Sequence, residues 1–239
     1  MKPATVSRLH TLSLRLGRML RRASHTIWPV QCALCDNALQ KHEDVLCLKC
    51  LMKLPVIHND TMLTYIGTPG SSIRVRSWFV YSHDDPSHRL IHHIKYNDRK
   101  KLARKLGREF TDYKHPEELG IDVILPIPLH WSKYVARGYN QSHEIALGIA
   151  DMTGIKIGHN LYAKKSHSTQ TSKNRDERAD NVRDIFSVRH PEQLDGKNIA
   201  LLDDVITTGA TMFSALKTIL AACTPASVTF LSLARTNRL

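Results

Sequence analysis

One stretch of this 239-residue chain, Asn198–Thr211 with the sequence NIALLDDVITTGAT, most constrains what it can fold into. An apolar run long enough for one buried strand comes first, and Asp203 and Asp204 follow at its carboxyl end. A small turn rich in hydroxyl groups comes next, and a helical pattern runs from Met212 to Ala222. This order predicts an anion site, because free backbone N–H groups and the positive end of the helix dipole point into the turn.

The side chains of the stretch indicate what else a ligand would carry. Gly209 lets the backbone come close to a ligand, and the threonine hydroxyls add hydrogen-bond donors. The carboxylates of Asp203 and Asp204 cannot bind phosphate themselves, but they suit sugar hydroxyls or a divalent cation. An ordinary strand, turn and helix with a polar cap would not require two adjacent carboxylates beside a TTGAT turn.

Together these residues resemble the signature of the type I phosphoribosyltransferases, proteins that bind phosphoribosyl pyrophosphate (PRPP). The resemblance implies that Asp203 and Asp204 hold the ribose 2′- and 3′-hydroxyls and that the turn cradles the 5-phosphate. The residues that it assigns to the phosphate are Thr207, Thr208, Gly209, Ala210 and Thr211.

Four of the five cysteines form two close pairs, Cys32 with Cys35 and Cys47 with Cys50. Two CxxC pairs separated by eleven residues are typical of a tetrahedral zinc site, in which each pair forms a tight knuckle. Two disulfides or a redox CxxC are the alternatives. We expect zinc, because the chain shows no recognisable secretory signal and carries two copies of the motif. Residues 31–55 are therefore expected to form a small four-cysteine zinc module stabilised by its metal.

The net charge of +12 and the isoelectric point near 9.6 suggest anionic partners such as phosphorylated ligands, nucleic acid or a lipid surface. Residues 1–30 contain six Lys and Arg but no Asp or Glu, and so supply half of this charge. Their leucines and arginines fall on opposite faces of a helix. Such a helix would lie on an anionic membrane or nucleic acid, or pack on its own domain with a solvated basic face. The segment also looks like a mitochondrial presequence.

From residue 77 onward, short apolar runs alternate with helical periodicity, which predicts a parallel α/β sheet. We expect strands at 77–81, 122–127, 160–164, 182–189, 198–202 and 227–233, and helices over 88–110, with a break at Asn97-Asp98, and over 138–152. Residues 56–76 are interpreted as an irregular connection, and Leu129–Arg137 as a turn. Ligands of such sheets bind at the carboxyl ends of the strands, so Arg137 and Gln141 would join the acidic pair there. The basic run around Lys95 is interpreted as a solvated face, with a phosphate-facing role for Lys95 as the alternative.

Residues 166–181 form a long polar segment with acidic and basic residues mixed. It is either a disordered linker or a lid that becomes ordered over a bound ligand. We favour the lid, because the segment lies between two core elements. Arg175 and Arg178 would then approach the pyrophosphate.

The order of the motifs resembles that of the ComF family, also called ComFC/GntX-like proteins. The resemblance covers about residues 30–236 and includes the two CxxC pairs, HHIKY, LPIPLHWSKYVARGYNQS and LLDDVITTGAT. Relatives often carry a further cysteine pair, whereas residues 51–222 contain no cysteine. The resemblance to this family implies a type I phosphoribosyltransferase-like parallel sheet flanked by helices over residues 77–239. It also implies that the protein is bacterial and cytoplasmic. It also implies a link to natural transformation, in which such proteins handle incoming single-stranded DNA at the inner membrane.

Two functions of different classes follow. As a phosphoribosyltransferase, the chain would bind Mg²⁺ with PRPP, and Asp203 and Asp204 would stabilise an oxocarbenium-like transition state. Arg137, Arg175 and Arg178 would neutralise the leaving pyrophosphate. As a non-catalytic module, it would respond to PRPP and bind single-stranded DNA or a DNA-processing protein. The sequence leaves the choice open and does not identify the acceptor.

Overall fold

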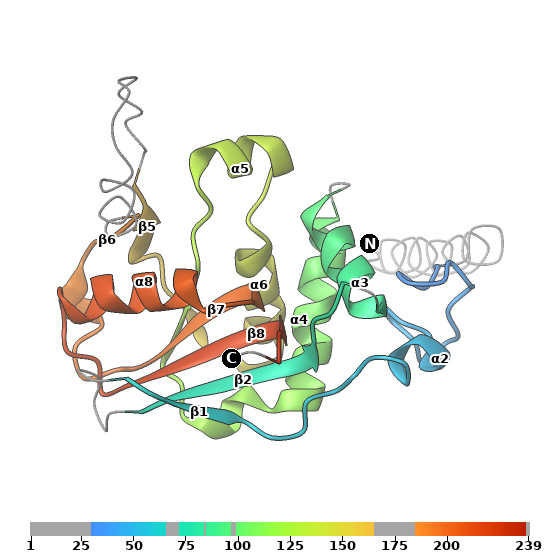
Figure 1. Ribbon diagram of the computed structural model, residues 1–239, viewed down its shortest axis with the longest axis horizontal. Coiled ribbons are helices and arrows are strands. Elements are labelled where there is room, and N and C mark those ends of the chain that lie inside the picture. The colour runs from blue at the N-terminus through green and yellow to red at the C-terminus, as the bar shows by residue number, and fades with distance from the viewer. Residues whose placement is uncertain (1–29, 66–71, 84, 97–98, 165–184, 238–239) are drawn as a thin grey trace, which may run out of the picture. The chain divides into compact units, whose positions relative to one another are not determined.

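The computed structural model describes residues 30–65, 72–83, 85–96, 99–164 and 185–237 (Figure 1). The chain divides into two compact units, Met1–Leu51 and Met52–Leu239. The predicted basic helix within residues 1–30 and the predicted lid at 166–181 lie outside the described residues, except for Val30. None of the helices in these ranges is long and apolar enough to cross a membrane.

The described part of the first unit is a short chain folded around its cysteines. An antiparallel bridge joins Gln31 to Ala38, and the backbone N–H of Cys32 donates to the carbonyl of Asn37 at 2.8 Å. The helix α2 (Leu48–Leu51) begins directly after Cys47. This unit has few apolar side chains to bury, so a bound metal ion or disulfide bonds are needed to stabilise it.

A six-stranded sheet in the order β1-β2-β8-β7-β3-β4 forms the centre of the second unit. Its strands are β1 (Thr61–Thr64), β2 (Ser72–Val80), β3 (Val123–Pro126), β4 (Lys156–Ile157), β7 (Asn198–Ile206) and β8 (Ser227–Arg235). The edge strand β1 is antiparallel to β2, and the other neighbouring pairs are parallel. The predicted parallel α/β fold is therefore confirmed.

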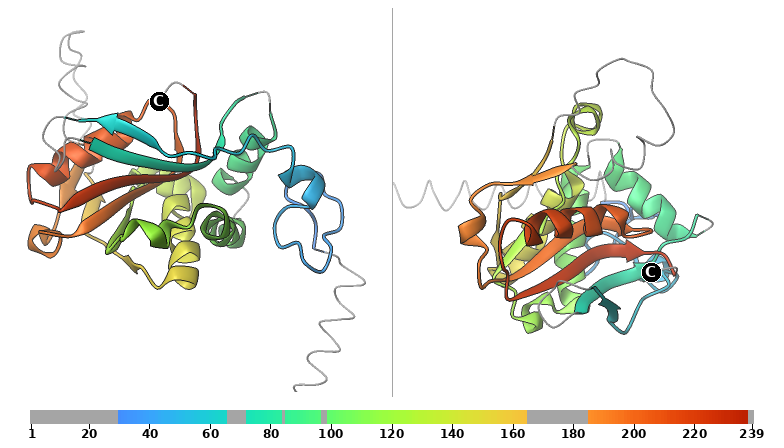
Figure 2. Two further views of the ribbon diagram at one scale, coloured as in Figure 1. Left: turned by 90° about the horizontal axis from the view of Figure 1, so that it is seen from below. Right: turned by 60° about the vertical axis from the view of Figure 1, so that its left-hand side comes forward.

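Helices cover both faces of this sheet (Figure 2). They are α3 (Pro86–Lys95), α4 (Lys100–Lys114), α5 (Trp131–Arg137), α6 (Gln141–Thr153) and α8 (Ala210–Leu220), with short 3-10 turns at Pro116–Leu119 and Pro191–Gln193. The helix α8 connects β7 to β8 on one side, and α6 connects β3 to β4 in the opposite direction along the sheet. Since parallel crossovers are right-handed, opposite directions put α8 and α6 on opposite faces.

The core on the α8 side is built from alternating residues of the central strands. Ile199 and Leu201 of β7 are fully buried there against Leu216 and Ile219 of α8. Strands covered on both faces are apolar along their whole length, which explains the run at the start of the opening motif. The core thus fixes the position of the residues that follow Leu202.

Two glycines let α4 and α6 approach closely on the other face. A Cβ on Gly107 would clash with the carbonyl oxygen of Ile145, and one on Gly148 would clash with the carbonyl oxygen of Arg104. The absence of side chains at these two positions therefore sets the distance between the helices, and with it the position of the first turn of α6.

Three expectations about local structure were wrong. Residues 56–76 include the edge strand β1 and the start of β2, in which polar and apolar residues alternate from Ser72 to Arg76. The predicted turn at Leu129–Arg137 contains the helix α5, which is capped by the side chain of His130. Strand β7 does not end before Asp203 but continues to Ile206. The expected strands at 160–164 and 182–189 correspond to β5 (Leu161–Ala163) and β6 (Phe186–Val188), which pair antiparallel to each other and lie outside the main sheet, while residues 182–184 are not among the described residues.

Candidate functional site

The acidic pair lies at the topological switch point of the sheet. β3 and β7 are neighbours in the sheet. After β3 the chain crosses to β4 on one side, and after β7 it crosses to β8 on the other side. No crossover therefore covers the space beyond the carboxyl ends of β3 and β7. The ladder between them stops at Pro126 and Leu202, one residue before Asp203. The acids therefore project where an open α/β sheet accepts a ligand.

Asp203 is half-buried and is held by the first turn of α6. The hydroxyl of Ser142 donates to its Oδ1 at 2.9 Å, and the backbone N–H of Asp204 donates to the same oxygen at 2.9 Å. Burial and the adjacent carboxylate of Asp204 raise the pKa of Asp203 to about 7, against the effect of Ser142 and Lys95. Near neutral pH this carboxyl can thus be present in either protonation state.

Asp204 is buried and forms an ion pair with a lysine from another helix. Its Oδ2 lies 3.1 Å from Nζ of Lys95, the last residue of α3, and its Oδ1 accepts from the backbone N–H of Val205 at 2.9 Å. The side chain of Lys95 is only 26% exposed. The sequence-based interpretation of Lys95 as part of a solvated face was therefore wrong.

The turn after β7 has the geometry of an anion-binding helix start. Gly209 precedes α8 with φ of 75°, a left-handed conformation that favours glycine. Thr207, Thr208 and Thr211 are exposed, as is Ala210. The hydroxyl of Thr208 accepts from the backbone N–H of Ala210, the first residue of α8, at 3.4 Å. The residues predicted to bind the 5-phosphate are thus contiguous, and all of them except the buried Gly209 are exposed.

Arg137 ends α5 near the same first turn of α6. Its guanidinium donates to Oε1 of the buried Gln141 at 3.1 Å and lies 5.8 Å from the centre of the Tyr96 ring. Tyr96 directly follows Lys95, so Arg137 is connected through this ring to the chain segment that pairs with Asp204. The other two predicted arginines, Arg175 and Arg178, lie outside the described residues.

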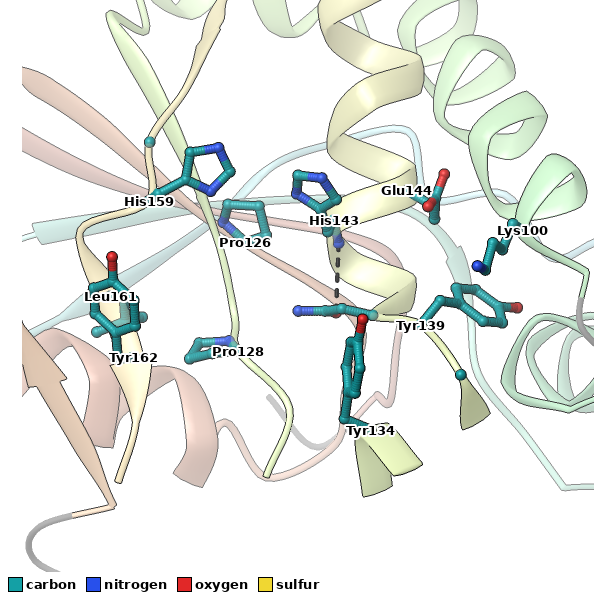
Figure 3. A pocket seen from close by; sticks show the side chains of 13 residues that line it. Lys100, Pro126, Pro128, Tyr134, Tyr139, His143, Glu144, His159, Leu161 and Tyr162 are labelled. Carbon is teal, nitrogen blue, oxygen red and sulfur yellow. Dashed lines mark hydrogen bonds between the residues drawn. The ribbon is translucent and has the colours of Figure 1, made fainter. Parts of the chain in front are cut away.

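A pocket of about 340 Å³ lies in front of the first turn of α6 (Figure 3). Figure 3 shows His143 between His159 and Tyr162 on one side and Tyr139 and Lys100 on the other. The remaining lining residues include Pro126 and Pro128 from the end of β3, Tyr134 of α5, Asn140 and Glu144. Sequence reasoning did not single out this pocket or Ser142, because neither follows from the spacing of charged residues along the chain.

In the first unit, the four predicted metal ligands come together. One sulfur from each of Cys32, Cys35, Cys47 and Cys50 lies within 4.8 Å of the others. A tetrahedral zinc site with Zn–S bonds of about 2.3 Å has sulfur atoms about 3.8 Å apart, so the cluster fits such an ion. The four cysteines therefore lie close enough to hold a metal ion such as zinc.

The backbone also prepares one of these thiols for a metal. The N–H groups of Leu34 and Cys47 point to Sγ of Cys32 at 3.5 and 3.4 Å. Burial raises the pKa of Cys32, but these backbone N–H groups outweigh it and lower the pKa to about 7. A metal binds the thiolate form, which this arrangement favours.

The sheet order, the switch point and the acidic pair define an open, mostly parallel α/β protein with a candidate ligand site at the carboxyl ends of β3 and β7. Solved structures similar to it include the allosteric regulatory enzyme of purine biosynthesis, at 20% identity over 56% of this chain and 26% of that chain, with a TM-score of 0.41. Another is orotate phosphoribosyltransferase of Mycobacterium tuberculosis, at 12% identity over 78% of this chain and 93% of that chain, with a TM-score of 0.35.

Curated relatives of the chain are competence proteins and DNA utilization proteins. Competence protein F of Haemophilus influenzae is 29% identical over 54% of this chain and 59% of its own length. DNA utilization protein YhgH of Salmonella typhimurium is 27% identical over 82% of this chain and 86% of its own length. Competence protein ComFC of Bacillus subtilis is 26% identical over 65% of this chain and 62% of its own length.

These relatives confirm the resemblance to the ComF family. No family model matches the chain. The matches to the Haemophilus and Bacillus proteins span less than two thirds of the length of those proteins.

Proposed function

We propose that the second unit binds PRPP at the β3/β7 switch point. The observation that carries this proposal is the anchoring of both acids from separate helices, Asp203 by Ser142 and Asp204 by Lys95. Carboxylates fixed in this way are preorganised to accept hydrogen bonds from two neighbouring sugar hydroxyls. The exposed threonine turn at the start of α8 then takes the 5-phosphate.

The positive groups of the site suit the pyrophosphate end of PRPP. Arg137 already donates to a neighbouring side chain and keeps further guanidinium N–H groups for phosphate oxygens. Arg175 and Arg178 would add charge from the predicted lid. Mg²⁺ would enter with PRPP, because a magnesium ion is usually bound through substrate phosphates as well as protein carboxylates.

The chemistry that follows from this arrangement is transfer of the phosphoribosyl group. Asp203 and Asp204 would stabilise the positive charge that develops at C1 as the pyrophosphate leaves. The non-catalytic alternative is that PRPP acts only as a signal. Both alternatives use the same binding site. The enzyme would consume PRPP when an acceptor is present, whereas the signal-responsive module would bind PRPP without consuming it.

A role in DNA uptake or competence is the biological setting that we propose. It is supported by the names of the relatives, which are competence proteins and DNA utilization proteins. The net charge of +12 favours direct contact with single-stranded DNA, and residues 1–30 would add contact with DNA or with the inner face of the membrane.

The four-cysteine module would hold a structural zinc ion. We place the protein in the cytoplasm or peripherally at the inner membrane, with DNA-processing proteins as partners.

Titration calorimetry of PRPP with Mg²⁺ tests the binding site. Wild type should bind PRPP, and Asp204→Asn and Thr208→Ala should each weaken binding about tenfold to a hundredfold, since each removes one or two hydrogen bonds to the ligand. Asp112→Asn, an exposed carboxylate of α4, is the matched control and should bind as wild type does. Absence of PRPP binding to wild type would refute the proposal.

The DNA contact is tested separately with a fluorescent single-stranded oligonucleotide. Binding should weaken steeply as salt concentration rises, because lysines and arginines displace counterions from the phosphates. If binding is absent at low salt, the link to DNA must run through a partner protein. PRPP consumption in the presence of an acceptor distinguishes the enzyme from the signal-responsive module.

A further inference from the structure

The first turn of α6 contacts both the acidic pair and the pocket in front of it. Ser142 donates to Asp203, and the next residue, His143, lines the pocket with Asn140. Pro126 and Pro128 form another wall at the end of β3, the strand that pairs with β7. A molecule in this pocket therefore lies one strand away from a ribose held by the acids.

The walls of the pocket are flat. Tyr134 and Tyr162 present aromatic rings, and the guanidinium of Arg189 lies 4.3 Å from the centre of the Tyr162 ring, which holds that ring in place. Tyrosine and proline faces suit a planar ligand, and a volume of about 340 Å³ is at the small end of the range for ligand pockets. The pocket thus fits a small molecule with one or two fused rings.

The polar groups of the pocket are two imidazoles, one carboxylate, the Lys100 ammonium, tyrosine hydroxyls and the amide of Asn140. That amide is engaged already, since its Oδ1 accepts from the N–H groups of Ser142 and His143 and its Nδ2 donates to the carbonyl of Ile127. Among the other groups, His143, His159 and Glu144 offer acceptors for a ring N–H. These groups can both accept a proton and orient a ring N–H.

We propose that this pocket holds the acceptor of the phosphoribosyl transfer, a planar nitrogen heterocycle, and that His143 takes the proton from its attacking ring nitrogen. The inference rests on the proposed function, because the reaction needs PRPP bound at the acidic pair. It adds the place where the acceptor binds in this chain and the residue that takes its proton.

The step balances with the two substrates alone. The ring nitrogen forms a bond to C1 of the ribose, while the bond from C1 to the pyrophosphate oxygen breaks and its electron pair leaves with pyrophosphate. The proton of the ring N–H moves to the neutral imidazole of His143, which later releases it to water.

The surroundings of His143 favour the neutral form. Burial and the neighbouring His159, whose ring centre lies 5.6 Å away, lower the pKa of His143, while Glu144 acts against them. Lys100 is the other charged group that faces the pocket. A neutral imidazole at pH 7 is the form that can accept a proton.

Turnover by the full chain tests the role of His143. PRPP, Mg²⁺ and one free base at a time (adenine, guanine, hypoxanthine, cytosine or uracil) are incubated with the protein, and pyrophosphate and nucleotide are measured. His143→Gln keeps the size and polarity of the side chain but cannot take the proton, so kcat should fall about 10²- to 10⁴-fold. PRPP affinity by calorimetry should be unchanged, and His190→Gln, at an exposed position, should leave turnover unchanged.

The pH profile separates a base from a merely structural residue. Wild-type turnover should decline on the acid side as His143 becomes protonated, and the residual turnover of His143→Gln should lose that decline. A decline caused by Asp203 would persist in the variant. Full turnover in His143→Gln, or a persistent acid limb, would overturn the assignment of the base.

Equilibrium dialysis of the same bases, with and without PRPP, tests the pocket independently of turnover. Tyr162→Ala should weaken base binding about tenfold by removing one stacking surface, with PRPP affinity unchanged. If wild type binds PRPP but no base, and turns none over, this inference fails and the proposed function stands. If it binds bases but not PRPP, the proposed function and the transfer step fail together, while the pocket keeps its ligand class.

Discussion

Nζ of Lys95 at the end of α3 lies 3.1 Å from Oδ2 of Asp204 in β7, a contact between residues 109 positions apart in the chain. The side chain of Asp204 is 10% exposed, so the ammonium group compensates a carboxylate that has little access to water. It also offsets part of the repulsion between the two adjacent acids.

Replacement of Lys95 by methionine should lower the free energy of unfolding by about 1–3 kcal/mol, because it leaves a buried charge without its partner. Urea unfolding near neutral pH measures the change. The double variant Lys95→Met/Asp204→Asn should recover most of the loss. The same substitution at the exposed Lys101 should have no effect. A loss that the second substitution does not reduce would rule out the ion pair as its cause.

Asp203 should make the stability of the free protein depend on pH. Its pKa is raised from 3.8 to about 7, so between these values the folded state binds more protons than the unfolded state. Stability is therefore lost as the pH rises from about 4 to about 7. Relative to Asp203→Asn, wild type should lose on the order of 1–2 kcal/mol across this window, a figure reduced for the partial exposure of the side chain. The free energies of unfolding of the two proteins are compared inside this window, at about pH 5, and above it, at about pH 8. An equal change in both proteins between these two pH values would contradict the prediction.

Gly148→Ala tests the close approach of α4 and α6. In an exposed helix this substitution stabilises by about 1 kcal/mol through helix propensity. Here a methyl group would meet the carbonyl oxygen of Arg104, so we expect destabilisation of about 1–3 kcal/mol. Thermal unfolding gives the sign directly, and an increase in Tm would show that the helices can separate at no cost.

Zinc content tests the cysteine cluster. Wild type purified without chelator should carry about one zinc ion per chain, as expected for a closed four-thiolate site. Cys47→Ser should lose the ion and lower the thermal stability of the first unit. Cys223→Ser is the matched control, because this buried thiol lies in the second unit and donates to the carbonyl of Ile219. Equal zinc content in both variants would refute the cluster as the metal site.

Most of the fold could be predicted from local patterns. The apolar runs of β7 and β8 are long enough, and buried enough, to be recognised without knowledge of their neighbours. The cysteine spacing likewise predicts a cluster, since two residues between ligands already bring two sulfurs together. In both cases the signal lies within a few residues of sequence.

The elements that were missed depend on contacts or on exposure. Strand β1 has only four residues and a half-polar pattern, because it lies at the edge of the sheet. Helix α5 is short and none of its residues is buried, so it has no apolar stripe from which to predict it. The partners of the acids, Ser142 and Lys95, come from other elements, and only the folded sheet brings them to the carboxyl end of β7.

The end of the β3/β7 ladder gives the acids a further task. Past Leu202, strand β7 has no hydrogen-bonding neighbour on the β3 side, and the carboxylates themselves accept from the next N–H groups, those of Asp204 and Val205. On the β3 side, the N–H of Asp204 thus has its acceptor in the preceding carboxylate rather than in a neighbouring strand, while β7 stays paired with β8 as far as Ile206. Because an ionised carboxylate can accept several hydrogen bonds, a ligand hydroxyl can bind Asp203 without displacing this backbone donor. Protection of the Asp204 amide from hydrogen exchange should therefore persist when a ligand binds.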